Sequence, residues 1–383
     1  MFRFATAAQI VFGSGALAEL ARHGRAFGGR VSLVLGQSAR HEAAVRGLLE
    51  GVGVQVDVSH VTGEPTVEGV LDLVERARAA GSEWVLGVGG GSVLDAAKAV
   101  AALVANPGDP LEFLEVVGRG RPLERAPLPF VAVPTTAGTG AEVTKNAVLA
   151  STAHGVKVSL RSEAMLPRLA LIDPDLTLSV PPALTAATGL DALTQVLEPF
   201  VSCQHNPLTD ALAREGLRRG ARALRRAYHE GSDREARSDM ALVSLFGGVC
   251  LANAKLGAVH GFAGPVGGMF PAPHGAVCAR LLPIVVERNV AALRARAPHS
   301  PILGRYAEVA ASLTGRPSAA PEDAAPWLRE LVLELAIPGL GQYGLAARDI
   351  PVLVEKAQRS SSMQGNPIVL TAEELTATLA AAL

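Results

Sequence analysis

The residues with the clearest capacity for chemistry lie in the second half of the chain. Asp191 and Gln195 are four residues apart, so a helix there would place both side chains on one face. Farther along, His260 and His274 are each followed by glycine in an otherwise apolar stretch. A carboxylate and two imidazoles suit a divalent transition metal such as Zn²⁺ or Fe²⁺. Because the chain has nine histidines, the same residues also fit a surface aspartate and hydrogen-bonded core histidines.

A glycine-rich loop in the first half is a candidate phosphate site. Gly89-Gly90-Gly91-Ser92 follows the apolar run Trp84–Val88 and precedes a helical pattern. Free N–H groups and the helix dipole at such a point attract anions, and Ser92 can cap the helix or contact a phosphate. The spacing is neither GxGxxG nor GxxxxGK[ST], which argues against a standard Rossmann fingerprint and against a nucleotide hydrolase. An ordinary glycine turn is the alternative.

A second polar loop begins at Pro134, directly after the apolar run Phe130–Val133, and is rich in threonine and glycine. Its hydroxyl-bearing residues are Thr135, Thr136, Thr139 and Thr144. Ligands of open α/β sheets bind outside the carboxyl ends of the strands, so two such loops favour ligand binding over two unrelated turns.

The elements around these loops alternate between short β-rich runs and helical stretches. We expect strands at Val31–Leu35, Val54–Val58, Trp84–Val88 and Phe130–Val133, with helices between them such as Val67–Ala80 and Leu94–Val104. This alternation predicts an α/β domain with a parallel sheet and helices on both faces. After Asp173-Pro174 helical periods dominate, which predicts an all-α second domain. We place the domains at 1–178 and 179–383.

Composition limits the class of protein. The chain has 383 residues, 49% of them hydrophobic and 19% charged, which is enough for sizeable cores and argues against global disorder. A formal net charge of −1 gives no reason to expect nucleic acid or a membrane surface as a partner. Three cysteines without a CxxC motif fit a reducing compartment, and we see no signal peptide, so a cytoplasmic location is expected.

Taken together, these segments resemble the iron-containing (group III) alcohol dehydrogenase family over nearly the whole chain. The stretches that carry the resemblance include Gly89–Asp95, Pro134–Thr144, Gly189–Leu193, Asn206–Asp210, Pro273–Gly275 and Asn366-Pro367. The resemblance implies a dinucleotide-binding α/β domain and a helical domain, as in dehydroquinate synthase-like proteins. It also implies NAD or NADP as cofactor, one Fe²⁺ or Zn²⁺ ion, and a homodimer or larger homo-oligomer.

The resemblance also assigns roles to residues. It implies that Asp191, His260 and His274 bind the metal. It implies cofactor contacts from Gly89, Gly90, Gly91 and Ser92 to the pyrophosphate, from Thr135, Thr136 and Thr144 on the nicotinamide side, and from Lys157 near the ribose. Asp95 and Thr139 belong to the same cofactor-binding motifs.

Three positions depart from the family pattern. Gln195 stands where the family usually has a histidine as its second metal ligand. An amide oxygen is a poorer ligand for Fe²⁺ than an imidazole, so Gln195 would be a weak fourth ligand or a hydrogen-bonding group to the substrate. Gly264 replaces a further active-site histidine. Leu35-Gly36-Gln37 lacks the aspartate that many NAD-using members carry, which removes repulsion against a 2′-phosphate and predicts that NADP is tolerated or preferred.

The sequence therefore predicts a metal-assisted, NAD(P)-dependent dehydrogenase that transfers a hydride between the nicotinamide and a small alcohol, aldehyde or ketone. Three alternatives remain open: a metal-independent reductase resembling the maleylacetate reductases, a dehydroquinate synthase-like lyase, and a non-catalytic nucleotide-binding protein. Turnover with any alcohol would separate an enzyme from a binding protein, and a chelator would separate metal-dependent from metal-free chemistry. The substrate, the metal and the physiological direction do not follow from the sequence.

Overall fold

The computed structural model describes residues 1–115, 117–152, 154 and 156–383, which form two compact units. The sheet unit consists of Ala5–Thr136 and Gly140–Thr177. The helical unit consists of Leu178–Leu383 together with two short pieces, Met1–Phe4 and Ala137–Thr139. The division of the chain into two domains at residue 178 stays a prediction.

The sheet unit is built on six parallel strands in the order β1-β8-β5-β4-β2-β3. These are β1 (Ile10–Phe12), β2 (Arg30–Gly36), β3 (Gln55–Val61), β4 (Trp84–Gly89), β5 (Phe130–Pro134) and β8 (Leu169–Ile172). In the register of β4 with β5, Gly89 pairs with Pro134, so the glycine loop and the threonine loop leave neighbouring strands at the same level. The predicted parallel sheet is confirmed.

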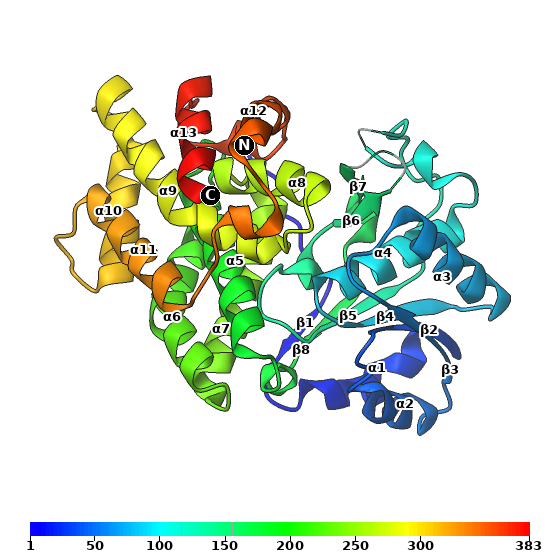
Figure 1. The fold of residues 1–383 in the computed structure, drawn as a ribbon. Helices are drawn as coiled ribbons and strands as arrows, with labels where there is room; N and C mark the ends of the chain where they lie inside the picture. The colour runs from blue at the N-terminus through cyan, green and yellow to red at the C-terminus, as the bar shows by residue number, and fades with distance from the viewer. Residues whose placement is uncertain (116, 153, 155) are drawn as a thin grey trace. The chain divides into compact units, whose positions relative to one another are not determined.

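Helices cover both faces of this sheet, as Figure 1 shows. The side chains of β2 alternate: Val34 joins the core formed with α3 (Val67–Ala79) and α4 (Gly91–Ala105). Leu33 and Leu35 join the opposite core, formed with α1 (Glu19–Phe27) and α2 (Glu42–Glu50). Successive side chains of a strand point to opposite faces of the sheet, so a strand buried on both faces needs apolar residues at every position. A separate antiparallel hairpin, β6 (Asn146–Ser151) with β7 (Val156–Arg161), lies outside the main sheet.

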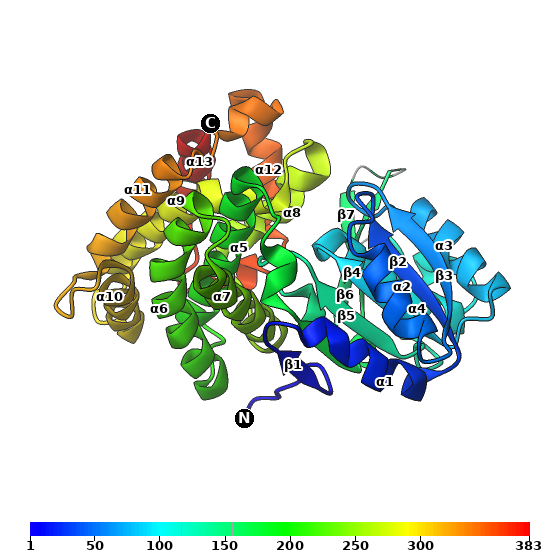
Figure 2. The same ribbon diagram turned by 90° about the horizontal axis from the view of Figure 1, so that it is seen from below.

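The helical unit is built around α5 (Pro182–Val201), which packs against α6 (Pro207–His229), α7 (Arg234–Asn253) and α9 (His274–Arg296); Figure 2 shows α6 and α7 beside it. The remaining helices are α8 (Ala258–Met269), α10 (Pro301–Thr314), α11 (Ala324–Glu334), α12 (Ile350–Gln358) and α13 (Ala372–Ala382). Local sequence sets several of the starts: proline stands in the first turn of α5, and Asn206 and Thr371 cap α6 and α13 with capping boxes. Because α5 is buried along most of its length, its polar residues face other helices rather than water.

Among the described residues, no single helix is both long and apolar enough to cross a membrane. The helices α7 and α8, which meet at 94°, pass the same test of length and composition only as a bent pair. Both contribute buried residues to the core of the helical unit.

Candidate active site

Three buried or half-buried side chains that the sequence singled out meet in the helical unit. Asp191 lies in the middle of α5, His260 in the first turn of α8, and His274 is the first residue of α9. The Oδ1 atom of Asp191 is 3.5 Å from Nε2 of His260 and 3.7 Å from Nε2 of His274. Donor atoms of these residues and of Cys278 all lie within 4.8 Å of one another. The structure thus brings together the three residues expected as metal ligands, and adds a thiol that the sequence analysis did not select.

Glu198 orients the His260 ring from the other side. Its Oε2 is 2.7 Å from Nδ1 of His260, and its Oε1 accepts a hydrogen bond of 2.7 Å from the backbone N–H of Val259. The N–H of Ala258 donates to Oδ1 of Asn366, so the first turn of α8 is capped by side chains from other elements. A carboxylate at Nδ1 holds the proton there and turns the lone pair of Nε2 toward Asp191, which is the usual support for a metal-binding histidine.

Several polar atoms of this cluster are buried and form no hydrogen bond with any described residue. They are Oδ1 of Asp191, Nε2 of His260 and Oε1 of Gln195. An unsatisfied buried polar group costs about 1–3 kcal/mol, so such atoms are rare unless a ligand satisfies them. Burial acts to raise the pKa of Asp191, but the imidazoles of His274 and His260 outweigh it and lower that pKa below its ordinary value. A carboxylate beside two imidazoles is a donor set that fits a divalent cation.

Gln195 is held by its amide nitrogen. Its Nε2 is 3.3 Å from both the carbonyl oxygen of Gly138 and Oδ2 of Asp191, and it donates to each. Turning the amide around would place Oε1 against two acceptors, so this orientation is the favoured one. The N–H of Gly138 in turn donates to Oγ of Ser244, which fixes the carbonyl that Gln195 needs. Gln195 therefore contacts the oxygen of Asp191 that faces away from the histidines.

Two glycines near the cluster have opposite surroundings. A Cβ added to Gly275 would lie 2.7 Å from the carbonyl oxygen of Ala187, so glycine is required where the start of α9 approaches α5. A Cβ added to Gly264 would meet no atom within 4 Å. The Cβ position of Gly264 is thus in open space.

The glycine loop follows β4 and leads into the first turn of α4. The N-cap of α4 is Gly90, without a side-chain hydrogen bond, and Ser92 lies inside the first turn. Of the two roles considered for Ser92, capping the helix is therefore wrong, and contact with a phosphate stays a prediction. None of the loop glycines has a positive φ, so a left-handed turn is not why they are glycines. A Cβ on Gly89 would be 2.6 Å from Cβ of Val93, and one on Gly90 would be 3.3 Å from Oγ1 of Thr136. The loop is packed closely, with the amino end of a 15-residue helix behind it.

A buried lysine organises the chain after β5. Nζ of Lys98 donates to the carbonyl oxygens of Ala141 (2.9 Å) and Asn146 (2.8 Å) and to Oγ1 of Thr144 (3.0 Å). Oδ2 of Asp95 accepts from the N–H of Val148, and its Oδ1 lies 3.7 Å from Nζ of Lys98. Thr144 and Asp95, both expected to contact the cofactor, thus also tie α4 to the threonine loop and to β6.

The other residues expected to contact the cofactor are spread over this region. Thr135 and Thr136 follow β5 directly and are half-buried, and the N–H of Thr135 donates to the carbonyl oxygen of Gly89. Thr139 is half-buried in the short piece of chain that belongs to the helical unit. Lys157 lies on β7, where Nζ is 2.6 Å from Oε1 of Glu64. Any role of Lys157 near a ribose would have to compete with that ion pair.

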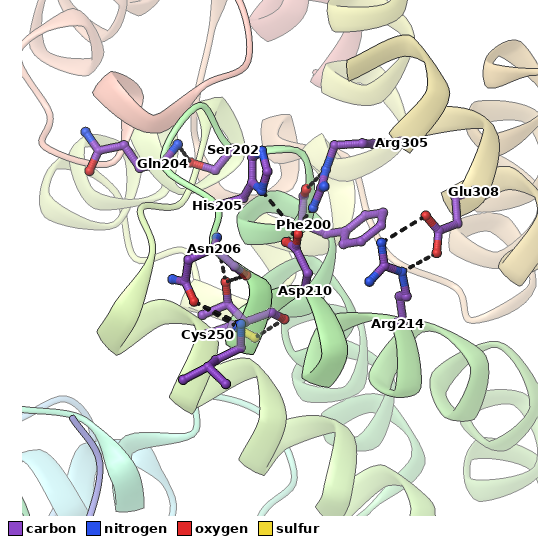
Figure 3. A network of polar contacts seen from close by, with 12 residues as sticks. Phe200, Ser202, Gln204, His205, Asn206, Asp210, Arg214, Cys250, Arg305 and Glu308 are labelled. Carbon is purple, nitrogen blue, oxygen red and sulfur yellow. Dashed lines mark hydrogen bonds and ion pairs between the residues drawn. The ribbon is translucent and has the colours of Figure 1, made fainter. Parts of the chain in front are cut away.

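His205, near the end of α5, takes part in a separate polar network (Figure 3). Its Nδ1 is 3.2 Å from Oδ2 of Asp210, whose other oxygen accepts from Arg305. The guanidinium carbons of Arg305 and Arg214 lie 4.1 Å and 5.1 Å from the centre of the Phe200 ring. Asp210 thus joins α6 to α10 through Arg305, and His205 contacts the same carboxylate.

Sequence reasoning missed Glu198 and Cys278 as members of the site. Glu198 is seven residues after Asp191, which is the spacing of one helix face, but a glutamate in a helix is more often solvated. Cys278 is four residues after His274, the same spacing that joined Asp191 to Gln195. That signal was present, although its use required knowing that α9 begins at His274.

A parallel sheet with a glycine loop at a helix start, and a helical unit with a carboxylate–imidazole cluster, are the parts that a metal-assisted dehydrogenase requires. The sequence profile described as iron-containing alcohol dehydrogenase matches residues 7–174, and that described as Fe-containing alcohol dehydrogenase family, C-terminal, matches residues 185–383. Alcohol dehydrogenase 4 of Schizosaccharomyces pombe is 34% identical over 373 residues, which cover 96% of this chain and 86% of that protein. The chain belongs to the iron-containing alcohol dehydrogenase family.

Solved structures agree with this assignment. A crystal structure of 1,3-propanediol oxidoreductase superposes with a TM-score of 0.92 at 32% identity and covers 100% of both chains. Sulfoacetaldehyde reductase from Bifidobacterium kashiwanohense, in complex with NAD⁺, has a TM-score of 0.87 at 28% identity and covers 100% of this chain and 98% of its own. The protein is thus an enzyme, an oxidoreductase of the alcohol dehydrogenase type, and the expected NAD(P) and divalent metal agree with the family.

Proposed function

We propose that this enzyme oxidises a small alcohol, or reduces the corresponding carbonyl compound, with Asp191, His260 and His274 as the ligands of its divalent metal. The observation that carries the proposal is the pair of unsatisfied buried atoms, Oδ1 of Asp191 and Nε2 of His260, which lie 3.5 Å apart with no hydrogen bond between them. A proton on Nδ1 of His260, shared with Glu198, would leave the lone pair of Nε2 for a cation.

A divalent metal at these ligands supplies Lewis acidity to the substrate oxygen, and the nicotinamide accepts or donates the hydride. The protein's own part is to hold the ligands. Glu198 fixes the ring of His260, and Gln195 fixes the carboxylate of Asp191 through Oδ2 so that Oδ1 stays available. Gln195 is in this view a positioning residue for Asp191. His274, about one third exposed, leaves the cluster accessible from its side.

For the cofactor, we propose that the amino end of α4 with Gly89, Gly90, Gly91 and Ser92 binds the pyrophosphate, because the helix start has no side-chain cap to compete with an anion. Thr135, Thr136 and Thr139 would contact the nicotinamide half. Asp95 and Thr144 would act through the shape of the threonine loop, because Lys98 and backbone groups already engage their side chains.

We further propose that the cofactor is NADP or either nucleotide. Gln37 is exposed directly after β2, the strand beside β4 in the sheet, and offers no negative charge to a 2′-phosphate there. A Gln37→Asp variant should shift the ratio of kcat/KM for NAD over NADP by roughly tenfold or more toward NAD, through charge repulsion of the 2′-phosphate. A wild-type enzyme that uses NAD alone would refute the proposal.

The function is tested by oxidation of a series of primary alcohols and diols, followed as NAD(P)H formation. An Asp191→Asn variant keeps the size of the side chain but removes its charge, and should lose roughly 100-fold or more in kcat. The metal-free forms of variant and wild type should unfold at similar temperatures, which shows that the variant is folded. A matched control, Asp239→Asn, alters a carboxylate that pairs with Arg219 elsewhere in the unit and should keep full activity. Equal activity of Asp191→Asn and the wild type would favour the metal-independent, maleylacetate reductase-like alternative. Assembly as a homo-oligomer is a further proposal, which sedimentation of the purified enzyme tests.

A further inference from the structure

Cys278 lies beside the proposed metal ligands. It is one helical turn after His274 on α9 and is completely buried. Its Sγ is 3.6 Å from Nε2 of His274, and it belongs to the group of donor atoms that all lie within 4.8 Å of one another. The group therefore contains an oxygen, two nitrogens and a sulfur.

The spacing of these atoms resembles the edges of a metal-centred tetrahedron. Bond lengths of about 2.0–2.1 Å for oxygen and nitrogen and about 2.3 Å for sulfur give edges of roughly 3.3 Å for an O–N pair and roughly 3.5 Å for an N–S pair. The observed pairs are 3.5 and 3.7 Å between Asp191 and the two histidines, and 3.6 Å between His274 and Cys278. These three pairs are within about 0.4 Å of the expected edges, and the remaining pairs lie within 4.8 Å.

Gln195 could reach a cation only through Oε1, which has no hydrogen-bond partner among the described residues. Its amide turns both N–H bonds toward acceptors, the carbonyl of Gly138 and Oδ2 of Asp191, and a protonated amide nitrogen cannot bind a cation. The loss of a histidine ligand at Gln195 thus coincides with a thiol on the neighbouring helix.

We propose that Sγ of Cys278 is a fourth protein ligand of the metal, giving a ligand set of Asp191, His260, His274 and Cys278. The inference rests on the proposed metal site. On coordination the S–H bond breaks, the proton leaves to solvent, and a sulfur lone pair forms the bond to the metal. A soft thiolate among these ligands favours Zn²⁺ over the hard cations Mg²⁺ and Mn²⁺.

A bound divalent cation deprotonates a coordinating thiol outright, so coordination leaves a spectroscopic mark. The alternative role for Cys278 is that of a small buried apolar residue.

The test uses the full-length enzyme, stripped of metal and reloaded with Co²⁺. Cys203 and Cys250 are the other two cysteines, and replacing both with serine leaves Cys278 as the sole source of a thiolate-to-cobalt charge-transfer band in the near ultraviolet. We expect about one Co²⁺ per chain and this band in the wild type and in the Cys203→Ser/Cys250→Ser variant. Cys278→Ser and Cys278→Ala should lose the band and lose roughly tenfold or more in Zn²⁺ affinity.

The outcomes separate the inference from the metal site on which it rests. One bound Co²⁺ without the band in the wild type overturns Cys278 as a ligand and leaves the other three in place. A band that survives in Cys278→Ser, or disappears with Cys250→Ser alone, also overturns it. No bound Co²⁺ in the folded wild-type enzyme refutes the metal site itself, and with it the inference.

Discussion

Replacing Glu198 with glutamine should weaken the metal site without touching a ligand. The carboxylate accepts from the N–H of Val259 through Oε1 and faces Nδ1 of His260 through Oε2, each at 2.7 Å. Glutamine has one oxygen for these two donors, so its NH₂ group must face one of them. Either the first turn of α8 keeps an unpaired buried N–H, or His260 moves its proton to Nε2 and presents N–H where a cation would bind.

The magnitude follows from these two contacts. A buried donor left without a partner costs about 1–3 kcal/mol, and hydrogen bonds to a charged group contribute about 1.5–3 kcal/mol, so a loss of about 3 kcal/mol in the free energy of unfolding is expected. Loss of the carboxylate behind a metal-binding histidine lowers metal affinity by roughly 10- to 100-fold.

Both quantities are measurable on the same preparation. Zn²⁺ affinity is obtained by competition with a chromophoric chelator, and the free energy of unfolding of the metal-free protein from urea titration. The control is Glu308→Gln, which alters an exposed carboxylate paired with Arg214 and should change stability by less than about 1 kcal/mol and leave Zn²⁺ affinity unchanged. If Glu198→Gln binds Zn²⁺ as tightly as the wild type, Glu198 does not orient a ligand and the assignment of His260 fails.

Other changes test the surroundings of the site. Gly275→Ala places a methyl group 2.7 Å from the carbonyl oxygen of Ala187, so it should cost about 1–3 kcal/mol of stability and weaken Zn²⁺ binding through the neighbouring His274. Gly264→Ala enters open space and should change stability by less than about 1 kcal/mol. Equal unfolding temperatures of the two variants would contradict this difference. Burial raises the pKa of Glu142 from 4.5 to about 7, so the folded state holds this proton more tightly and loses stability as pH rises through that range. Glu142→Gln should therefore gain stability over the wild type between pH 5 and pH 8, by up to about 3 kcal/mol, in urea titrations at the two pH values; a difference that does not vary with pH would show that Glu142 is ionised throughout.

Much of the fold was predictable because its elements follow local rules. The strands Trp84–Gly89 and Phe130–Pro134 were expected to within a residue. Short apolar runs that end at glycine or proline usually form buried strands. The three-residue strand β1 was not expected, because its pairing with β8 is a tertiary contact with no periodic signal. The chain from Asn146 to Ile172 forms the hairpin of β6 and β7 and one strand of the main sheet, β8, and that division depends on the pairing partners of each strand.

Site residues that belong to a sequence motif could be predicted, whereas residues whose role depends on a tertiary contact could not. Asp191, His260 and His274 were selected by residue type and motif. The fold brings them together although His260 lies 69 positions after Asp191, and His274 lies 14 positions after His260. The role of Gln195 could not be read from the sequence, because it depends on the carbonyl of Gly138, a residue 57 positions away that no pattern connects to it.

The most direct test of the account is the metal content of the purified enzyme, measured by elemental analysis together with NAD(P)H-linked alcohol oxidation before and after chelation. The account predicts about one Zn²⁺ or Fe²⁺ per chain, activity lost on chelation, and activity restored by the metal. Full turnover by a protein that contains no metal would contradict it, and would mean that the cluster of Asp191, His260 and His274 serves another purpose.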